Sequence, residues 1–221
     1  MATAAGGASV VLLHGLLRSA FSMAVLAHDL ARAGYRVSNV GYPSRPYDVA
    51  GLVERYVRPA IEGCDLARPV HVVTHSLGGI LIRGYLQSNR LPAGSRIVML
   101  APPNHGSEVA DFVRDWPLYR WLMGRVGQQL GTGPDGIVKR LQPVQEEVGV
   151  IAANRSLQPW FSRLFDGPND GMVSVESTRL PEMRDFIVVD DTHTLLMFDR
   201  EVRRQVRHFL AEGSFRHGTE G

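Results

Sequence analysis

A serine lies among small residues at the end of a valine run in the stretch VVTHSLGG, residues 72–79. The pattern G-x-S-x-G marks a strand-to-helix turn that raises a serine hydroxyl above a sheet as a nucleophile. Two glycines satisfy the pattern after Ser76, whereas Thr74 stands where the first glycine belongs. Because threonine is short and β-branched, it suits the end of a strand, and we expect the turn to persist with its helix pushed slightly outward. The alternative is that Ser76 only caps the following helix, which is a common place for serine.

A second motif could supply hydrogen-bond donors to such a serine. The pair His14-Gly15 closes the first apolar run, SVVLLHG. In a sheet of this kind, the loop after the first strand offers a backbone N–H that faces the serine turn, and the residue after the serine offers another. We therefore predict that the N–H groups of Leu16 and Leu77 form an oxyanion hole. The alternative is an ordinary turn that needs a glycine.

Candidates for a base and an acid follow the last two expected strands. The chain order serine, acid, histidine is the order of a Ser-His-Asp triad in folds of alternating strands and helices. His193 stands just past a strand, in a short loop, where it could take the serine proton. Asp170 lies in the tight turn Asn-Asp-Gly, from which it could reach the top of the sheet. Three other acids compete for this role: Asp166, Asp190 and Asp191.

No metal site or cofactor is predicted. His71 and His75 are four residues apart, but on a strand this spacing separates them by roughly 13 Å, too far for one ion. We interpret both as packing residues. Cys64 is the single cysteine, so the chain has neither an internal disulfide nor a set of thiolate ligands.

The elements that must position these residues alternate along the chain. Short apolar runs predict strands over 9–14, 35–43, 69–75, 95–103, 147–154 and 184–191. Helical spacing predicts helices over 19–34, 48–63 and 77–89, with a closing helix over 194–213. Strands that alternate with helices of this length imply an α/β fold, with a mostly parallel sheet covered on both faces.

The composition is that of one ordinary domain. The chain has 221 residues, of which 44% are hydrophobic and 21% charged. Its formal charge of +2 is too small to indicate a nucleic-acid partner. No run approaches the length needed to cross a bilayer, so stable membrane insertion is not expected. The first residues lack the basic region of a signal peptide, which favours a cytoplasmic protein over a processed secreted one. The sequence is silent on oligomeric state.

Taken together, these stretches resemble the α/β-hydrolase superfamily, and within it the small bacterial lipases and esterases. The resemblance rests on VVLLHGLLRSAFSM, HVVTHSLGG, MLAPPNHGSEVAD, GPNDGMVSVESTRL and DTHTLL, which together run from residue 10 to about 197 in the family's order. It implies Ser76 as nucleophile, His193 as base and Asp170 as orienting acid, with the two backbone donors named above. Thr74 is the departure from the family's pattern.

The resemblance also implies a lid-like insertion, at about 104–146 of a single domain that spans 1–221. This segment is rich in large apolar residues and is long for a plain connection. Trp116, Trp121 and Leu122 are candidates for binding an apolar acyl group or for transient contact with a lipid surface. The alternative is that they only pack the insertion against the body of the domain.

The predicted function is that of a serine carboxylester hydrolase, an esterase or lipase, with a small-molecule or lipid ester as substrate. A thioesterase or an acyltransferase would use the same three residues, and nothing in the sequence separates them from an esterase. A non-catalytic binding protein of the same fold is the third reading. Dehalogenases and epoxide hydrolases of this fold typically need an aspartate where Ser76 stands.

Overall fold

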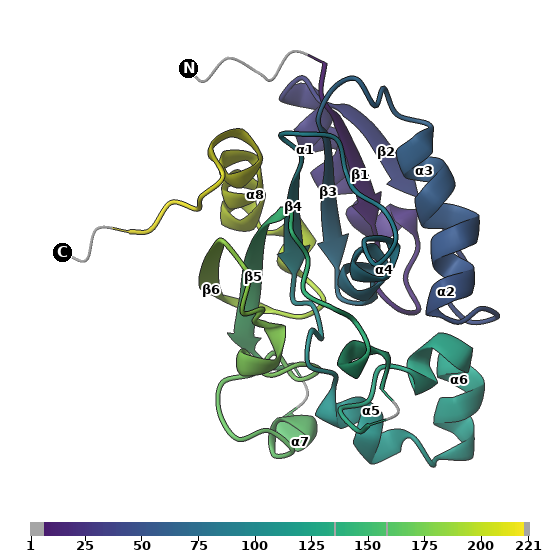
Figure 1. The fold of residues 1–221 in the computed structure, drawn as a ribbon. Helices are drawn as coiled ribbons and strands as arrows, with labels where there is room; N and C mark the ends of the chain where they lie inside the picture. The colour runs from purple at the N-terminus through teal and green to yellow at the C-terminus, as the bar shows by residue number, and fades with distance from the viewer. Residues whose placement is uncertain (1–6, 135, 158, 219–221) are drawn as a thin grey trace.

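Six parallel strands form one sheet in the structure, a computed structural model that describes residues 7–134, 136–157 and 159–218 (Figure 1). The strands are β1 (Ser9–Leu13), β2 (Arg36–Val40), β3 (Val70–His75), β4 (Arg96–Leu100), β5 (Glu147–Arg155) and β6 (Asp185–Thr192). Their order across the sheet is β2-β1-β3-β4-β5-β6, and every neighbouring pair is parallel. All six strands expected from the sequence are confirmed, and so is the α/β class.

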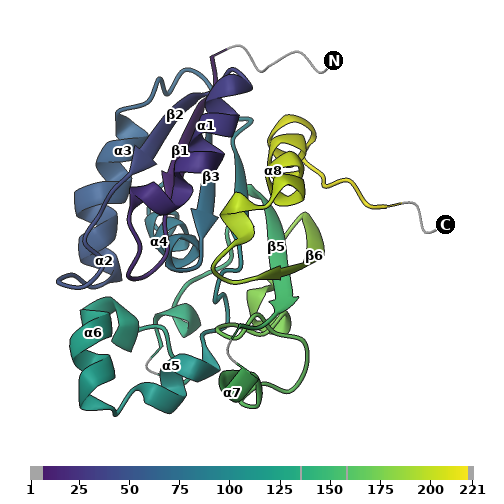
Figure 2. The ribbon, with the colours of Figure 1, turned by 180° about the vertical axis from the view of Figure 1, so that it is seen from behind.

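Helices cover both faces of the sheet (Figures 1 and 2). One face carries α1 (Ala24–Arg32) and α8 (Arg200–Glu212), and the other carries α2 (Val49–Leu52), α3 (Arg58–Glu62) and α4 (Leu77–Tyr85). Three more helices lie beyond the carboxyl ends of the strands: α5 (Glu108–Val113), α6 (Pro117–Gln128) and α7 (Pro159–Ser162). Short 3₁₀ turns span Ala20–Met23, Ile137–Lys139, Glu176–Thr178 and Leu196–Phe198. Within the described ranges, no helix is long and apolar enough to cross a membrane.

The strands are apolar on both sides because each side of the sheet is covered by helices. In β1, Val11 and Leu13 pack into the cluster beneath α2, α3 and α4. The alternate residues Val10 and Leu12 pack into the cluster beneath α1 and α8. This alternation is the period of two expected of a strand, with both sets of side chains buried.

The order of the strands makes two connections diverge at the carboxyl ends of β1 and β3. The connection that follows β1 leaves toward α1 on one face, while β3, its neighbour, continues directly into α4 on the other face. In open parallel sheets, ligands bind at the carboxyl ends of two neighbouring strands whose connections diverge in this way. The fold therefore brings the loop after β1 and the turn after β3 together at the place where a ligand is expected.

The helices differ from the sequence prediction in their bounds, and two of the differences have a clear cause. The closing helix was expected over 194–213 but begins at Arg200, because the Asp199 carboxylate caps it by accepting the Val202 N–H at 2.8 Å. The helix expected over 48–63 contains a π turn over Val53–Val57, just before Pro59. Since proline has no N–H, it cannot continue the regular helical hydrogen bonding, which explains the irregular turn.

His71 makes the fold sensitive to acid. Its buried ring on β3 accepts the Arg96 N–H at Nδ1, at 3.0 Å. Burial, helped by the Arg96 charge, lowers the pKa of His71 from 6.5 to about 4. Between these two values the unfolded chain binds a proton that the folded chain does not, so stability falls as the pH drops through this window.

We expect His71→Asn to remove this sensitivity, because the asparagine oxygen can still accept the Arg96 N–H. From pH 7 to pH 5 the wild type should lose about 2 kcal/mol more unfolding free energy than the variant does. Urea unfolding at both pH values measures the difference, and the other buried histidines, present in both proteins, cancel. Equal losses in the two proteins would show that His71 is not held neutral by the fold.

Candidate active site

Ser76 forms the turn between β3 and α4. Its backbone has φ 50° and ψ −116°, a conformation that residues other than glycine rarely adopt. The turn is tight, because a Cβ at Gly78 would lie only 2.5 Å from the Leu13 carbonyl oxygen. The Ser76 side chain makes no capping hydrogen bond to α4. Helix capping, the alternative considered for this serine, therefore does not describe its hydroxyl.

Thr74 fits the turn because its extra atoms face the second of the two glycines. The Thr74 side chain is fully buried. A Cβ placed on Gly79 would be 3.6 Å from Thr74 Oγ1, an ordinary contact distance. The close approach of helix and strand thus depends on Gly78, and the residue two positions before the serine need not be glycine.

A chain of hydrogen bonds joins three of the predicted residues. His193 Nδ1 lies 2.6 Å from Asp170 Oδ2, and His193 Nε2 lies 3.1 Å from Ser76 Oγ. Because an ionised carboxylate can only accept, Nδ1 carries the proton, and Nε2 is left to accept the serine hydroxyl. This is the tautomer that a histidine needs in order to take a proton from a serine.

Asp170 is the acid that reaches His193. Its second oxygen, Oδ1, accepts the N–H groups of Met172 at 2.9 Å and Val173 at 2.8 Å, which fix the carboxylate in a buried turn. The competing acids lie elsewhere: Asp166 is exposed, Asp190 pairs with Arg155, and Asp191 accepts its neighbour's N–H at Thr192.

A second histidine holds the loop that carries His193. The Nε2–H of His75, which precedes the serine, donates to the His193 carbonyl oxygen at 2.8 Å. Burial, followed by the nearby His193, lowers the pKa of His75 well below its usual value, so this ring stays neutral. Both strand histidines, His71 and His75, are buried in β3, and neither belongs to a group of metal ligands among the residues that the structure describes.

The loop after β1 faces the serine turn. A Cβ at Gly15 would lie 2.7 Å from His75 Nδ1 and 3.3 Å from the Ser76 Cβ, so the close approach needs glycine there. The neighbouring His14 stacks on Tyr42 at 3.9 Å, and its Nδ1–H donates to the Gly15 carbonyl at 2.8 Å. The Leu17 N–H donates to Ser44 Oγ at 3.1 Å, which fixes the loop two residues beyond Gly15.

The two predicted backbone donors are Leu16, in the loop after β1, and Leu77, at the start of α4. In the described part of the chain, neither the Leu16 N–H nor the Leu77 N–H donates to a protein acceptor. Leu77 opens α4, where the first N–H groups of a helix lack partners within the helix. Both N–H groups are therefore free to donate to a bound acceptor.

An apolar cavity of about 430 Å³ includes Ser76 and His193 among its lining residues, and we call it the catalytic cavity because it contains the candidate site. Of the three predicted substrate-binding residues, Trp116 lines this cavity. Trp121 instead lines a neighbouring cavity, and the side chain of Leu122 lies outside the described part of the structure. The sequence reasoning missed several residues that also line the catalytic cavity: Arg18, Val109, Val113, Leu130, Phe161 and Met172.

The strain at Ser76 predicts a difference between two small substitutions. Alanine keeps the Cβ that is unfavourable at this φ, whereas glycine removes it. We therefore expect Ser76→Gly to be more stable than Ser76→Ala by about 1 kcal/mol, although glycine is usually the less stable of the two within regular structure. Thermal unfolding of the two variants measures this difference. A more stable alanine variant would mean that the turn is not strained.

The described residues contain no group of three or more histidine, cysteine or acidic side chains that could hold a metal ion.

A parallel sheet with a serine at the strand-to-helix turn, and with an aspartate and a histidine on later loops, is the architecture of the α/β hydrolases. Residues 10–218 match the alpha/beta hydrolase family. The chain belongs to this family.

Several solved structures share the fold. The Bacillus licheniformis lipase BlEst2 in its mature form superposes with a TM-score of 0.74 at 21% identity, over 92% of this chain and 91% of that chain. Phospholipase PlaB from Legionella pneumophila superposes with a TM-score of 0.70 at 17% identity, over 94% of this chain and 58% of that chain. The metagenomic carboxyl esterase MGS0156 superposes with a TM-score of 0.70 at 19% identity, over 88% of this chain and 66% of that chain. At these identities the likeness is one of fold. No curated protein sequence matches the chain.

Proposed function

We propose that the protein is a serine carboxylester hydrolase, an esterase or lipase, with Ser76, His193 and Asp170 as its catalytic triad. The observation that carries this proposal is the continuous hydrogen-bond chain from Ser76 Oγ through His193 to Asp170, at the base of an apolar cavity. The family and its lipase and esterase structural neighbours support a hydrolase in the broader sense.

In the proposed reaction, Ser76 Oγ attacks the ester carbonyl carbon while His193 Nε2 takes the hydroxyl proton. The oxygen that becomes negative accepts hydrogen bonds from the Leu16 and Leu77 N–H groups. His193 then returns the proton to the leaving alcohol, and an acyl group remains on the serine. Water, deprotonated by His193, attacks this acyl-enzyme and breaks the bond to Ser76 Oγ, which takes the proton back from His193 as the carboxylic acid leaves. Asp170 holds the ring in its tautomer and stabilises the imidazolium.

Residues 104–146 form a lid-like insertion in a single domain in this proposal. They contribute α5 and α6, and three side chains of this segment, Val113, Trp116 and Met123, line the catalytic cavity. These apolar groups are suited to the acyl chain of the substrate, because each CH₂ that they bury contributes about 0.8 kcal/mol.

The first test is a series of p-nitrophenyl esters from acetate to palmitate, together with a fluorophosphonate that labels activated serines. We expect kcat/KM to rise with chain length until the catalytic cavity is filled, and the label to add to Ser76, as read by peptide mass. A folded protein that hydrolyses no ester in the series and takes no label would contradict the proposal.

Filling the cavity should shift the preferred chain length. Val113 lines the cavity and is buried, so we expect Val113→Phe to move the optimum toward shorter acyl chains. Phe112, its neighbour on α5, is exposed and does not line the cavity, so Phe112→Tyr is the matched control. The same ester series reads both variants, and an unchanged optimum in Val113→Phe would place the acyl chain elsewhere.

A further inference from the structure

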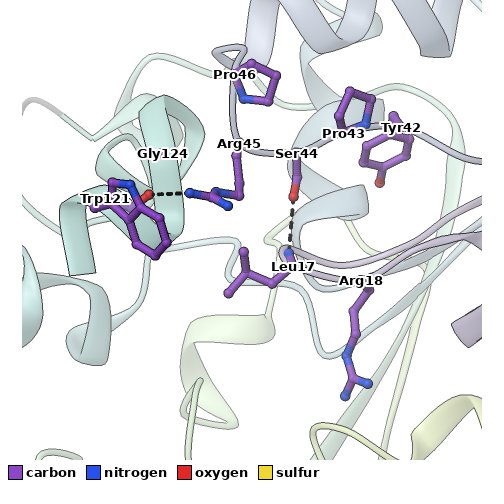
Figure 3. A pocket seen from close by; sticks show the side chains of 9 residues that line it. All are labelled: Leu17, Arg18, Tyr42, Pro43, Ser44, Arg45, Pro46, Trp121 and Gly124. Carbon is purple, nitrogen blue, oxygen red and sulfur yellow. Dashed lines mark hydrogen bonds between the residues drawn. The ribbon is translucent and has the colours of Figure 1, made fainter. Parts of the chain in front are cut away.

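A second cavity, of about 650 Å³, adjoins the catalytic cavity (Figure 3). Its lining residues include Leu17, Arg18, Arg45 and Trp121, and we call it the arginine-lined cavity. Leu17 and Arg18 line the catalytic cavity as well, so the two spaces meet at the loop after β1. A smaller hollow, which includes Phe198 in its lining, also shares these two residues. Arg18 therefore stands where all three spaces join.

No carboxylate shares this junction with Arg18 among the residues that the structure describes. Neither an aspartate nor a glutamate of these residues lines any of the three spaces. Among the described residues, neither Arg18 nor Arg45 takes part in an ion pair. A partly buried guanidinium without a carboxylate partner favours the approach of an anion, since it is less hydrated than it would be in open water.

The two arginines differ in what already holds them. Arg45 donates to the Trp121 carbonyl at 2.9 Å and stacks over the Trp121 ring, with 4.7 Å between the guanidinium carbon and the ring centroid. The side chain of Arg18 has no described hydrogen bond, and in Figure 3 it points away from Arg45. Arg18 is thus the group that is free to bind a ligand, while Arg45 fixes the loop after β2 against α6.

The catalytic cavity has lining residues of two kinds. Those from α5 and α6, such as Val109 and Met123, are apolar, whereas Arg18, from the loop after β1, is the one arginine among the described residues that line it. An ester whose carbonyl is bound at Ser76 would therefore have both apolar side chains and a cationic side chain in the same cavity. The apolar side chains suit its acyl chain, which leaves Arg18 to the alcohol part of the ester.

We propose that Arg18 binds an anionic group, a carboxylate or a phosphate, on the alcohol part of the ester, which makes anionic esters the preferred substrates. This inference rests on the proposed function, because it says which part of the ester contacts Arg18 while Ser76 attacks the carbonyl carbon. Arg18 acts on binding in this proposal and takes no part in the transfer of the acyl group.

The experiment compares the octanoyl esters of two nitrophenols, one with a carboxylate on the ring and one with a neutral carboxamide in the same position. The readout is the ratio of their kcat/KM values within each protein, so that general losses of activity cancel. We expect the wild type to prefer the anionic ester by about tenfold, mainly through KM, and Arg18→Gln to lose this preference. Arg18→Lys should retain part of it. Arg36→Gln is the control and should match the wild type, because Arg36 stands at the amino end of β2 and the cavities lie beyond the carboxyl ends of the strands.

A second pair, dihexanoyl phosphatidate and dihexanoylglycerol, replaces the carboxylate by a phosphate. A larger ratio in one pair identifies which anion Arg18 prefers, and both ratios should fall as salt is raised, because the site is open to solvent. Equal hydrolysis of the anionic and neutral members of both pairs, or an unchanged ratio in Arg18→Gln, overturns the inference alone. A wild type that hydrolyses none of these esters overturns the proposed function.

Discussion

Ser76→Ala is expected to lower kcat for a p-nitrophenyl ester by about 10⁴–10⁶-fold while the protein stays folded. Alanine removes the attacking oxygen and keeps the Cβ, so the backbone of the turn meets no new demand. The lost oxygen caps no helix N–H, and its described partner is His193 Nε2. Initial rates with each ester measure the loss, and thermal unfolding reports whether the fold is retained.

Two comparisons make this result specific. Ser88→Ala changes an exposed serine just after α4 and should leave the rate unchanged. The double variant Ser76→Ala/His193→Ala should be no slower than either single variant, because residues that act as one unit are not additive. If Ser76→Ala kept more than a tenth of the wild-type rate, Ser76 could not be the nucleophile.

The strands could be predicted because both faces of the sheet are covered. A strand buried on both sides has no polar face, so runs such as SVVLL and VHVVTH stand out from the chain as short apolar segments. The order of the strands across the sheet is different in kind. It depends on which apolar faces pack together, and the local sequence does not record it.

The candidate site could be predicted because its residues directly follow strands. Ser76 follows β3, His193 follows β6, and Asp170 lies between β5 and β6. The carboxyl ends of parallel strands meet at one edge, so residues that lie more than a hundred positions apart converge there. Their side chains lie within hydrogen-bonding distance of one another in the structure, as their positions after the strands implied.

The surroundings of the site could not be predicted in the same way. Trp116 and Trp121 lie five residues apart in the insertion, and the sequence offered both as acyl-binding residues. The structure directs them to different cavities, and Gly124, with a positive φ, breaks the helical geometry of α6. The position of Arg18 depends on a loop held by the Leu17 N–H bond to Ser44. No local pattern indicates either arrangement.

Asp170→Asn is expected to lower kcat by about 10⁴-fold, although it changes a single atom. Asp170 Oδ1 accepts two backbone N–H groups, from Met172 and Val173. Both donors need an oxygen, because an unpaired buried N–H costs about 1–3 kcal/mol. The asparagine oxygen must therefore occupy this position, and its NH₂ group must face His193 Nδ1.

This forced orientation inverts the histidine. An NH₂ group can only donate, so Nδ1 must give up its proton and the ring must carry it on Nε2 instead. Nε2 then donates to Ser76 Oγ and can no longer take the serine proton. The rate of fluorophosphonate labelling should fall together with kcat, because both need the activated serine. Asp166→Asn, at an exposed acid in the same loop, should leave both rates unchanged. A loss of less than tenfold in a folded Asp170→Asn protein would show that the carboxylate does not set the tautomer of His193.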